Sequence, residues 1–332
     1  MPEYFPEHSR AFQEALGHLN GRQAAVLGHV RPDGDCIGSQ VALARCLRAL
    51  GIDAVCYNHH MVPPNCRSFV GDTPFLLDEH GVDAGRLALS VDCADRKRLG
   101  PVLQEAYPDV YLNIDHHISN SRYAAHNLIE GQASATGEIL AGILLTLDLP
   151  MDPVTAQALY VGIATDTGQF RYASTTRDTF EICCHLMEKG ADASAAAHAL
   201  YENERPEKLA LLQRFLASFR FLCGKRVCLG IIDGKAWKAT GATKEDTEGL
   251  VDYARAIEGV EIGILLEEHE GALKGSFRAK DPIHRVDQLA RQFNGGGHAC
   301  AAGFNPETGL AEFYPRLVAA LEEHFAALKE GS

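Results

Sequence analysis

Short apolar runs alternate with longer segments of helical periodicity through the first half of the chain. We expect four strands there, each a brief apolar run, at 24–27, 54–57, 87–91 and 110–114. Residues 36–50 space their apolar side chains along one helix face, and Gly51 ends the pattern. Asp152 followed by Pro153 is a start signal for a helix through 165. This order predicts an α/β fold with a doubly wound, mostly parallel sheet and helices on both faces.

The second half of the chain has a different pattern. From 191 to 221 the residues are rich in Ala and Leu, which predicts helix without a strand. Further on we expect strands at 227–232, 261–266 and 272–279, and helices at 251–257, 286–293 and 310–328. We therefore predict a first domain at 1–190, a helical connector at 191–224, and a smaller α/β domain at 225–332.

Composition and charge limit the kind of protein. The 332 residues are 46% hydrophobic and 23% charged, as in globular enzymes, and favour two domains. No apolar run is long enough to span a membrane, and residues 1–10 lack a signal-peptide core, so we expect a cytoplasmic protein with no membrane partner. Ten cysteines without a CxxC pair indicate buried free thiols. The net charge of −13 argues against binding long nucleic acid.

Acidic residues and histidines gather where the predicted strands and helices end. They are His29-Val30-Arg31-Pro32-Asp33-Gly34-Asp35, then Asp92, then Asp115-His116-His117, then Asp166. A single aspartate in a turn is usually a helix cap or a turn former. Together, however, these groups can hold two adjacent divalent metals, a recurring device for hydrolysing phosphate esters. The mixture of carboxylates and imidazoles predicts Mn²⁺ first, with Mg²⁺ or Co²⁺ as alternatives.

Five motifs, in order along the chain, carry a resemblance to a known family. They are HVRPDGD (29–35), SVDCAD (90–95), IDHH (114–117), GIATDTGQFR (162–171) and FNGGGHACAAG (293–303). The first four resemble the motifs of the DHH phosphoesterase superfamily, and the fifth resembles the glycine-rich signature of its DHH-associated C-terminal domain. The chain looks most like the subfamily of oligoribonucleases that also act as pAp phosphatases.

The resemblance implies a role for each acidic residue and histidine. One metal would be held by His29, Asp33 and Asp92; the other would be held by Asp35, Asp92, His116 and Asp166, with Asp92 bridging. His117 would meet the scissile phosphate or the leaving group, which makes His117 and Asp92 the implied catalytic residues. Asp115 would orient a histidine. An exchange of roles between His116 and His117 stays open.

The glycine-rich segment is the candidate substrate reader. On the residues alone, its glycines either end the predicted helix 286–293 or direct backbone N–H groups at an anion. The resemblance implies that substrate is bound by Gly295, Gly296, Gly297, His298 and Arg278, with Ser276 and Arg171 as weaker candidates. Asn294 stands where relatives often carry glycine, which predicts a stiffer or differently angled loop. Five basic and two acidic residues between 271 and 298 form a local basic patch, which could equally be a solvated face.

These features imply a Mn²⁺-dependent phosphoesterase that hydrolyses short oligoribonucleotides and linear dinucleotides, and also 3′-phosphoadenosine 5′-phosphate (pAp). Metals in the first domain and an anion reader in the last predict a cleft that admits only short substrates. The alternatives are a cyclic-dinucleotide phosphodiesterase, a pyrophosphatase or polyphosphatase of the same superfamily, and a nucleotide sensor without catalysis. The sequence does not decide between a monomer and a homodimer. Ser134 and Thr136, which precede a helix near 137, are expected to cap it.

Overall fold

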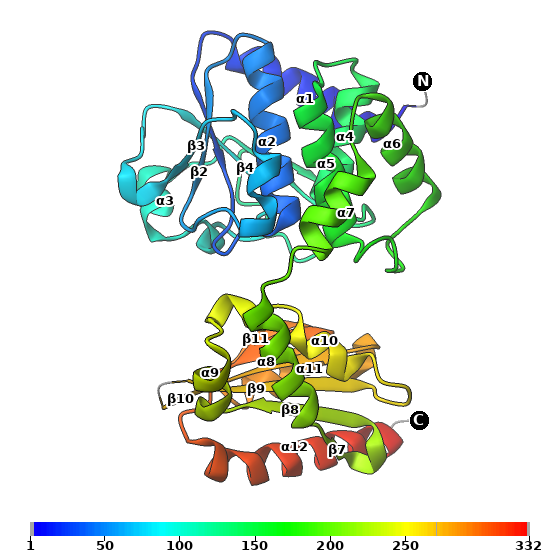
Figure 1. Cartoon of the computed structure of the whole chain (residues 1–332). Coiled ribbons are helices and arrows are strands. Elements are labelled where there is room, and N and C mark those ends of the chain that lie inside the picture. The colour runs from blue at the N-terminus through cyan, green and yellow to red at the C-terminus, as the bar shows by residue number, and fades with distance from the viewer. Residues whose placement is uncertain (1–2, 270, 331–332) are drawn as a thin grey trace. The chain divides into compact units, whose positions relative to one another are not determined.

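The computed structural model describes residues 3–269 and 271–330, and it divides into two compact units between Asn203 and Glu204 (Figure 1). The segment 191–224 holds α7 (Ala193–Tyr201) in the first unit, and α8 (Pro206–Ala217) and β7 (Arg220–Leu222) in the second. The expectation of no strand in this segment is therefore wrong at its end. The three-part division of the chain stays a prediction.

The first unit contains a six-stranded sheet in which all neighbouring strands are parallel. In spatial order the strands are β3 (Phe75–Leu77), β2 (Ala54–Asn58), β1 (Ala24–Leu27), β4 (Leu87–Val91), β5 (Leu112–Asp115) and β6 (His126–Ile129). The chain leaves β1 towards one edge and resumes at β4 towards the other. The carboxyl ends of β1 and β4 therefore flank the switch point, where doubly wound sheets bind ligands.

Helices cover both faces of this sheet, as predicted (Figure 1). On one face lie α1 (Pro6–Leu19), α2 (Gly34–Ala49), α4 (Thr136–Thr146) and α5 (Pro153–Asp166), with α6 (Arg177–Glu188) packed outside them. On the other face α3 (Pro101–Ala106) and the neighbouring 3₁₀ turn η3 (Arg96–Leu99) bury Leu99 and Leu103. A Cβ at Gly38 would lie 2.2 Å from the Ala158 carbonyl oxygen, so glycine permits the close contact of α2 with α5.

The second unit is a smaller α/β structure with a mixed sheet. In spatial order its strands are β11 (Gly296–His298), β12 (Ala301–Phe304), β10 (Ala272–Ala279), β9 (Ile262–His269), β8 (Val227–Ile232) and β7. Only β8 and β9 pair in parallel. One face is covered by α11 (Val286–Arg291) and α12 (Leu310–Glu330); the other is covered by α8, α9 (Gly234–Thr240) and α10 (Leu250–Arg255).

Two broader expectations can be compared with these units. None of the helices in the described residues combines the length and the apolar character needed to cross a bilayer. All ten cysteines are free thiols and seven of them are buried, so the prediction of buried free thiols is confirmed for most of them.

Candidate metal centre

The turn between β1 and α2 directs His29 into the interior. A Cβ at the preceding Gly28 would lie 2.4 Å from the Gln40 amide oxygen and 2.7 Å from Cys36 Sγ, so a larger residue would have to displace these side chains. His29 is buried, and its Nδ1 donates to the Val30 carbonyl at 2.9 Å. The lone pair of its Nε2 therefore points towards Asp92 Oδ2, at 3.3 Å, and Asp33 Oδ2, at 3.7 Å. Nε2 has no hydrogen-bond partner although it is buried, which is the environment expected of a metal ligand.

Asp33 caps helix α2 and also faces the metal centre. Its Oδ1 accepts the backbone N–H of Cys36 at 3.1 Å and so caps α2. Its Oδ2 is the oxygen that faces His29. The capping role expected of a turn aspartate and the predicted ligand role are therefore compatible, because each uses a different oxygen.

Asp35 is fully buried at the start of α2, and its carboxylate lies against the N-terminus of α4. Its Oδ2 accepts the backbone N–H of Thr136 at 2.7 Å, and its Oδ1 accepts that of Gly137 at 2.8 Å. Burial, reinforced by the nearby Asp166 carboxylate, raises the pKa of Asp35 to about 7. A buried carboxylate of this kind is stabilised in its charged form by a cation.

Asp92 lies at the centre of the group. It follows β4 with φ of 52°, a left-handed conformation that is uncommon outside glycine and turns the carboxylate into the site. Its Oδ2 faces His29 Nε2, whereas its Oδ1 lies 3.7 Å from His116 Nε2 and accepts the Thr136 hydroxyl at 3.2 Å. Burial and the Asp35 carboxylate raise the pKa of Asp92 well above its ordinary value. Asp92 Oδ1 also lies 3.5 Å from His117 Nδ1. Its Oδ2 thus faces His29 while its Oδ1 faces His116 and His117, so the two oxygens point to different sides of the cluster, as a bridging ligand requires.

The two histidines after β5 have different partners. His116 donates from Nδ1 to the Ala133 carbonyl at 3.4 Å, so its Nε2 faces Asp166 Oδ2 at 3.1 Å. His117 Nδ1 lies 2.7 Å from Asp115 Oδ1, and the other oxygen of Asp115 accepts the Asn120 amide at 2.6 Å. Asp115 therefore orients His117. Both histidines belong to candidate metal groups, so the division of roles between them stays a prediction.

The electrostatics of the group favour cations. Burial lowers the pKa of His116, but the carboxylates of Asp166, Asp35 and Asp92 outweigh it and bring that pKa to about 10. Divalent ions would take the place of such protons, because metal ligands must be deprotonated.

The described residues contain three groups whose ligand atoms lie within 4.8 Å of one another. They are His29–Cys36–Asp92, Asp92–His116–His117 and Asp35–His116–Asp166. All six predicted metal ligands lie in or directly beside these groups, and they fit a pair of divalent metals that shares Asp92. Cys36 was not predicted; burial raises the pKa of its thiol to about 11, so we do not assign it as a thiolate ligand.

The sequence did not identify the side chains that hold these ligands. Thr136 was expected to cap α4, but that helix has no side-chain cap and the Thr136 hydroxyl instead donates to Asp92. Ser39 donates to Asp35 at 3.4 Å, and Asn120 to Asp115. Asn120 lies three residues after the IDHH motif, and Ser39 lies four residues after Asp35 on the same helix, so both are signals that could have been used; the contact of Thr136 with Asp92 is set only by the fold.

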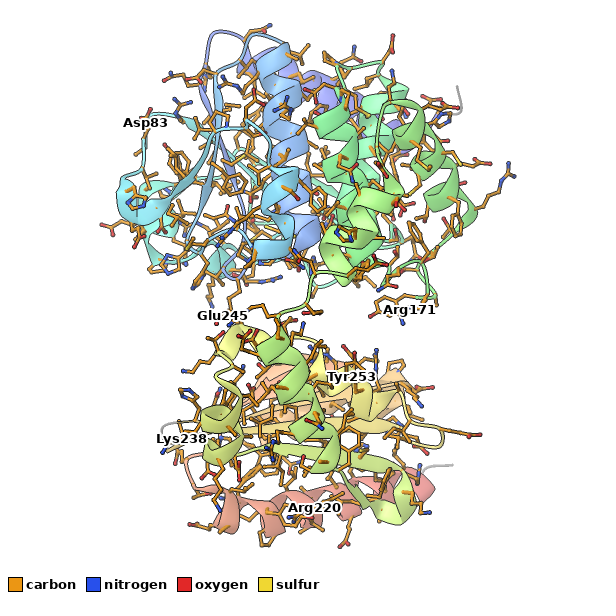
Figure 2. The ribbon with its side chains drawn as sticks, in the orientation of Figure 1. Asp83, Arg171, Arg220, Lys238, Glu245 and Tyr253 are labelled. Carbon is orange, nitrogen blue, oxygen red and sulfur yellow. The ribbon has the colours of Figure 1, made fainter. Side chains whose placement is uncertain are left out.

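The predicted substrate-binding residues lie mostly in the second unit. Arg278 on β10 and His298 on β11 are both paired with Ala301 on β12, so their backbones occupy one row across three strands. The side chain of His298 lies outside the part of the structure that is described. Ser276 and Arg278 are half-buried on the face of β10 opposite Phe277. Arg171 belongs to the first unit, where it is exposed on the loop after α5 (Figure 2).

The glycine-rich segment is an edge strand rather than a helix cap with a flexible turn. A Cβ at Gly295 would lie 2.2 Å from the Gly303 carbonyl oxygen, and one at Gly297 would lie 2.4 Å from the Ala301 carbonyl oxygen. Those two glycines therefore allow β11 to approach β12. Gly296 has no heavy atom near its Cβ position, so its surroundings are open. Asn294 adopts φ of 57°, a left-handed conformation that asparagine tolerates.

The predicted basic patch is partly neutralised. Arg285 lies 2.8 Å from Asp287, Arg291 lies 3.8 Å from the same carboxylate, and Lys274 lies 3.5 Å from Glu267. The local positive charge is therefore smaller than the sequence suggests.

Comparison with known proteins places this geometry in a family. Residues 23–163 match the model of the DHH family, N-terminal domain, and residues 227–327 match that of the DHHA1 domain. The chain belongs to the DHH family. Both domains occur in the order expected from the five motifs, and the predicted metal ligands up to His116 lie inside the first match.

Relatives of this DHH protein cover nearly its whole length. The bifunctional oligoribonuclease and PAP phosphatase NrnA of Thermus thermophilus is 27% identical over 97% of this chain and 95% of its own. The protein of the same name from Bacillus subtilis is 27% identical over 83% of this chain and 86% of its own. An exopolyphosphatase-related protein from Bacteroides fragilis has the same fold, with a TM-score of 0.89, 22% identity and 99% coverage of both chains.

Proposed function

We propose that this chain is a metal-dependent phosphoesterase that hydrolyses short oligoribonucleotides and linear dinucleotides to mononucleotides, and pAp to AMP. The position of Asp92 carries this proposal, because its two oxygens face His29 and His116 in one buried cluster. Membership of the DHH family and the names of the NrnA relatives support the reaction and the substrate class. We propose Mn²⁺ as the metal, with Mg²⁺ or Co²⁺ as alternatives, because the donors mix carboxylates with imidazoles.

The roles of the metal ligands follow from the contacts of each side chain. A bound metal pair supplies a hydroxide nucleophile at neutral pH and charge stabilisation of the phosphate. We assign His29, Asp33 and Asp92 to one ion, and Asp35, Asp92, His116 and Asp166 to the other. The hydrogen bonds of His29 and His116 to backbone carbonyls fix their rings so that Nε2 is the ligand atom.

His117 is the residue we assign to the scissile phosphate or leaving group. The short contact with Asp115 holds a proton on Nδ1, so Nε2 is the nitrogen that exchanges a proton or hydrogen bond with substrate. Asp115 is itself fixed by Asn120, which keeps the imidazole from rotating. We therefore propose that Asp115 acts on the reaction through the orientation of His117.

We assign substrate recognition to Arg278, Ser276 and the segment 295–298 of the second unit, and to Arg171 of the first. The pairing of Arg285 and Arg291 with Asp287 leaves less positive charge for a pyrophosphate or polyphosphate than the sequence suggests. Nucleotides, which carry their phosphates at separate positions and also present a base, suit this surface better. The net charge of −13 also disfavours long RNA.

A substrate panel tests the proposed function. The purified chain with Mn²⁺ would be given pGpG, a 5-nucleotide RNA, a 24-nucleotide RNA, cyclic di-AMP, pAp and pyrophosphate. We expect mononucleotides from the first two, AMP from pAp, and slow or no turnover of the 24-nucleotide RNA. Turnover of pyrophosphate alone would contradict the substrate assignment while leaving the metal centre intact, and turnover of cyclic di-AMP alone would indicate a cyclic-dinucleotide phosphodiesterase.

A further inference from the structure

The segment from Ala133 to Gly137, which leads into α4, contacts the metal centre without supplying a predicted metal ligand. The backbone N–H groups of Thr136 and Gly137 bind the two oxygens of Asp35 at 2.7 and 2.8 Å. The Thr136 hydroxyl donates to Asp92 Oδ1 at 3.2 Å. One residue, Thr136, therefore contacts two carboxylates that come from different parts of the chain.

The same segment also orients a histidine ligand. The carbonyl of Ala133 accepts the Nδ1–H of His116 at 3.4 Å, which turns Nε2 towards Asp166 and Asp92. Thr136 is fully buried, so bulk water does not replace its hydroxyl. The arrangement of Asp35, Asp92 and His116 thus depends on the placement of a single turn.

The buried carboxylate of Glu138 also holds that turn in place, through contacts that do not involve the metal centre. Glu138 accepts the backbone N–H of Ser134 at 2.7 Å and also the Ser134 hydroxyl. Its second oxygen accepts the hydroxyl of Thr179, at the start of α6, at 3.2 Å. Glu138 is buried and is not among the predicted metal ligands. Its contacts fix the first turn of α4 against α6, so Thr136 has little freedom to move.

We propose that Thr136 is a positioning residue of the metal centre. Its hydroxyl holds Oδ1 of Asp92 on the side of His116, and this leaves Oδ2 facing His29. A bridging carboxylate needs this orientation, because each oxygen must reach a different ion. The inference rests on the proposed function, since it assigns Thr136 to a centre that binds two metals.

The test compares three variants of the full chain: one that removes the Thr136 hydroxyl, one that keeps it, and one that removes a hydroxyl elsewhere. Thr136→Val removes the hydroxyl and keeps the backbone N–H to Asp35, whereas Thr136→Ser keeps the hydroxyl. Thr155→Val is the matched control: Thr155 is also buried and donates its hydroxyl to an aspartate at 2.7 Å, but that residue, Asp152, is not a predicted metal ligand.

Mn²⁺ binding to the metal-free chains would be measured by calorimetry, and the loaded chains would be examined by electron paramagnetic resonance for coupling between two Mn²⁺ ions. We expect Thr136→Val to weaken at least one Mn²⁺ site by about 10- to 100-fold and to lose the coupled signal. The Mn²⁺ affinity of Thr136→Ser should stay within about threefold of that of the wild type, because serine keeps the hydroxyl. Thr155→Val should bind Mn²⁺ like the wild type. If Thr136→Val does not fold, Thr136→Ala removes the same hydroxyl and is titrated in its place.

The outcomes separate this inference from the proposed function. A wild-type chain that binds two Mn²⁺ ions, together with a Thr136→Val chain that binds them equally well, would overturn the positioning role alone. Equal weakening in Thr155→Val would also overturn it, because the effect would then follow from stability. A wild-type chain that binds no divalent metal would overturn the proposed function, and the positioning role with it.

Discussion

Gly162 lies on α5 where that helix passes Asp35 on α2, and the contact leaves no room for a methyl group. A Cβ at this position would lie 2.7 Å from Asp35 Oδ1 and 3.3 Å from Asp35 Cα. The carboxylate cannot simply swing aside, because two backbone N–H groups of α4 hold it in a fully buried place. Gly162→Ala must therefore either separate α2 from α5 or displace Asp35 from α4.

The magnitude follows from two opposing terms. Overpacking of a buried contact costs about 1–3 kcal/mol. Alanine in place of glycine in a helix contributes about 1 kcal/mol in the opposite direction. We therefore expect a net loss of about 0–2 kcal/mol in the free energy of unfolding. A displaced ligand should have a larger effect on the metal, about 10- to 100-fold in Mn²⁺ affinity.

The assay combines urea unfolding of the metal-free chain with calorimetric Mn²⁺ titration. Gly17→Ala is the matched control, because Gly17 also lies in a helix but has no heavy atom within 4 Å of its Cβ position. The control should gain about 0.5–1 kcal/mol of stability and bind Mn²⁺ like the wild type. If Gly162→Ala behaved like Gly17→Ala in both measurements, the contact between α2 and α5 would not be what places Asp35.

Three further predictions concern the rest of the chain. Arg45→Gln breaks the ion pair that ties α2 to Asp152 at the start of α5, and should lower the free energy of unfolding by about 1–2 kcal/mol in urea at pH 7. Because that pair holds the pKa of Asp152 at about 2, the difference in stability between wild type and variant should shrink as the pH falls below about 4 and towards 2. A difference that stayed constant with pH would contradict this. Burial lowers the pKa of both His284 and His324, so these two histidines should contribute a loss of stability below about pH 6.5, where the unfolded chain binds protons first. The urea midpoint of His324→Gln should therefore shift from pH 7 to pH 5 in a less destabilising direction than that of the wild type, and equal shifts in the two chains would refute this origin. Cys184 is the exposed cysteine and should be the first thiol to react with a thiol reagent, so Cys184→Ser should remove the fast phase and leave the slow ones.

The hydrophobic pattern predicted the strands that are buried on both faces. The expected ranges 24–27, 87–91 and 227–232 coincide with β1, β4 and β8, because each is a predominantly apolar run that ends at a turn. The pattern missed β3, β6, β7, β11 and β12, none of which is fully buried; all of these except β12 lie at sheet edges. Edge strands need few apolar residues, so their sequences resemble loops.

The candidate site was likewise predicted only in part. The motifs predicted the candidate ligands because their chemistry is visible in the residue types, as for Asp92 and His116. Some of the contacts that orient them are local, such as those of Ser39 and Asn120, but Thr136 binds Asp35 from 101 positions away. A threonine at a helix start has the same sequence signature whether it caps its own helix or binds another element. Only the fold distinguishes the two roles.

The most direct test of the central assignment is the rate of hydrolysis of a 5-nucleotide RNA by the wild type and by Asp92→Ala at saturating Mn²⁺, with the folded state of each chain checked by circular dichroism. We expect the folded variant to lose at least about 1,000-fold in kcat, because the residue that faces both halves of the cluster is removed. A folded Asp92→Ala chain that retained a tenth or more of the wild-type rate would contradict a two-metal mechanism centred on this carboxylate.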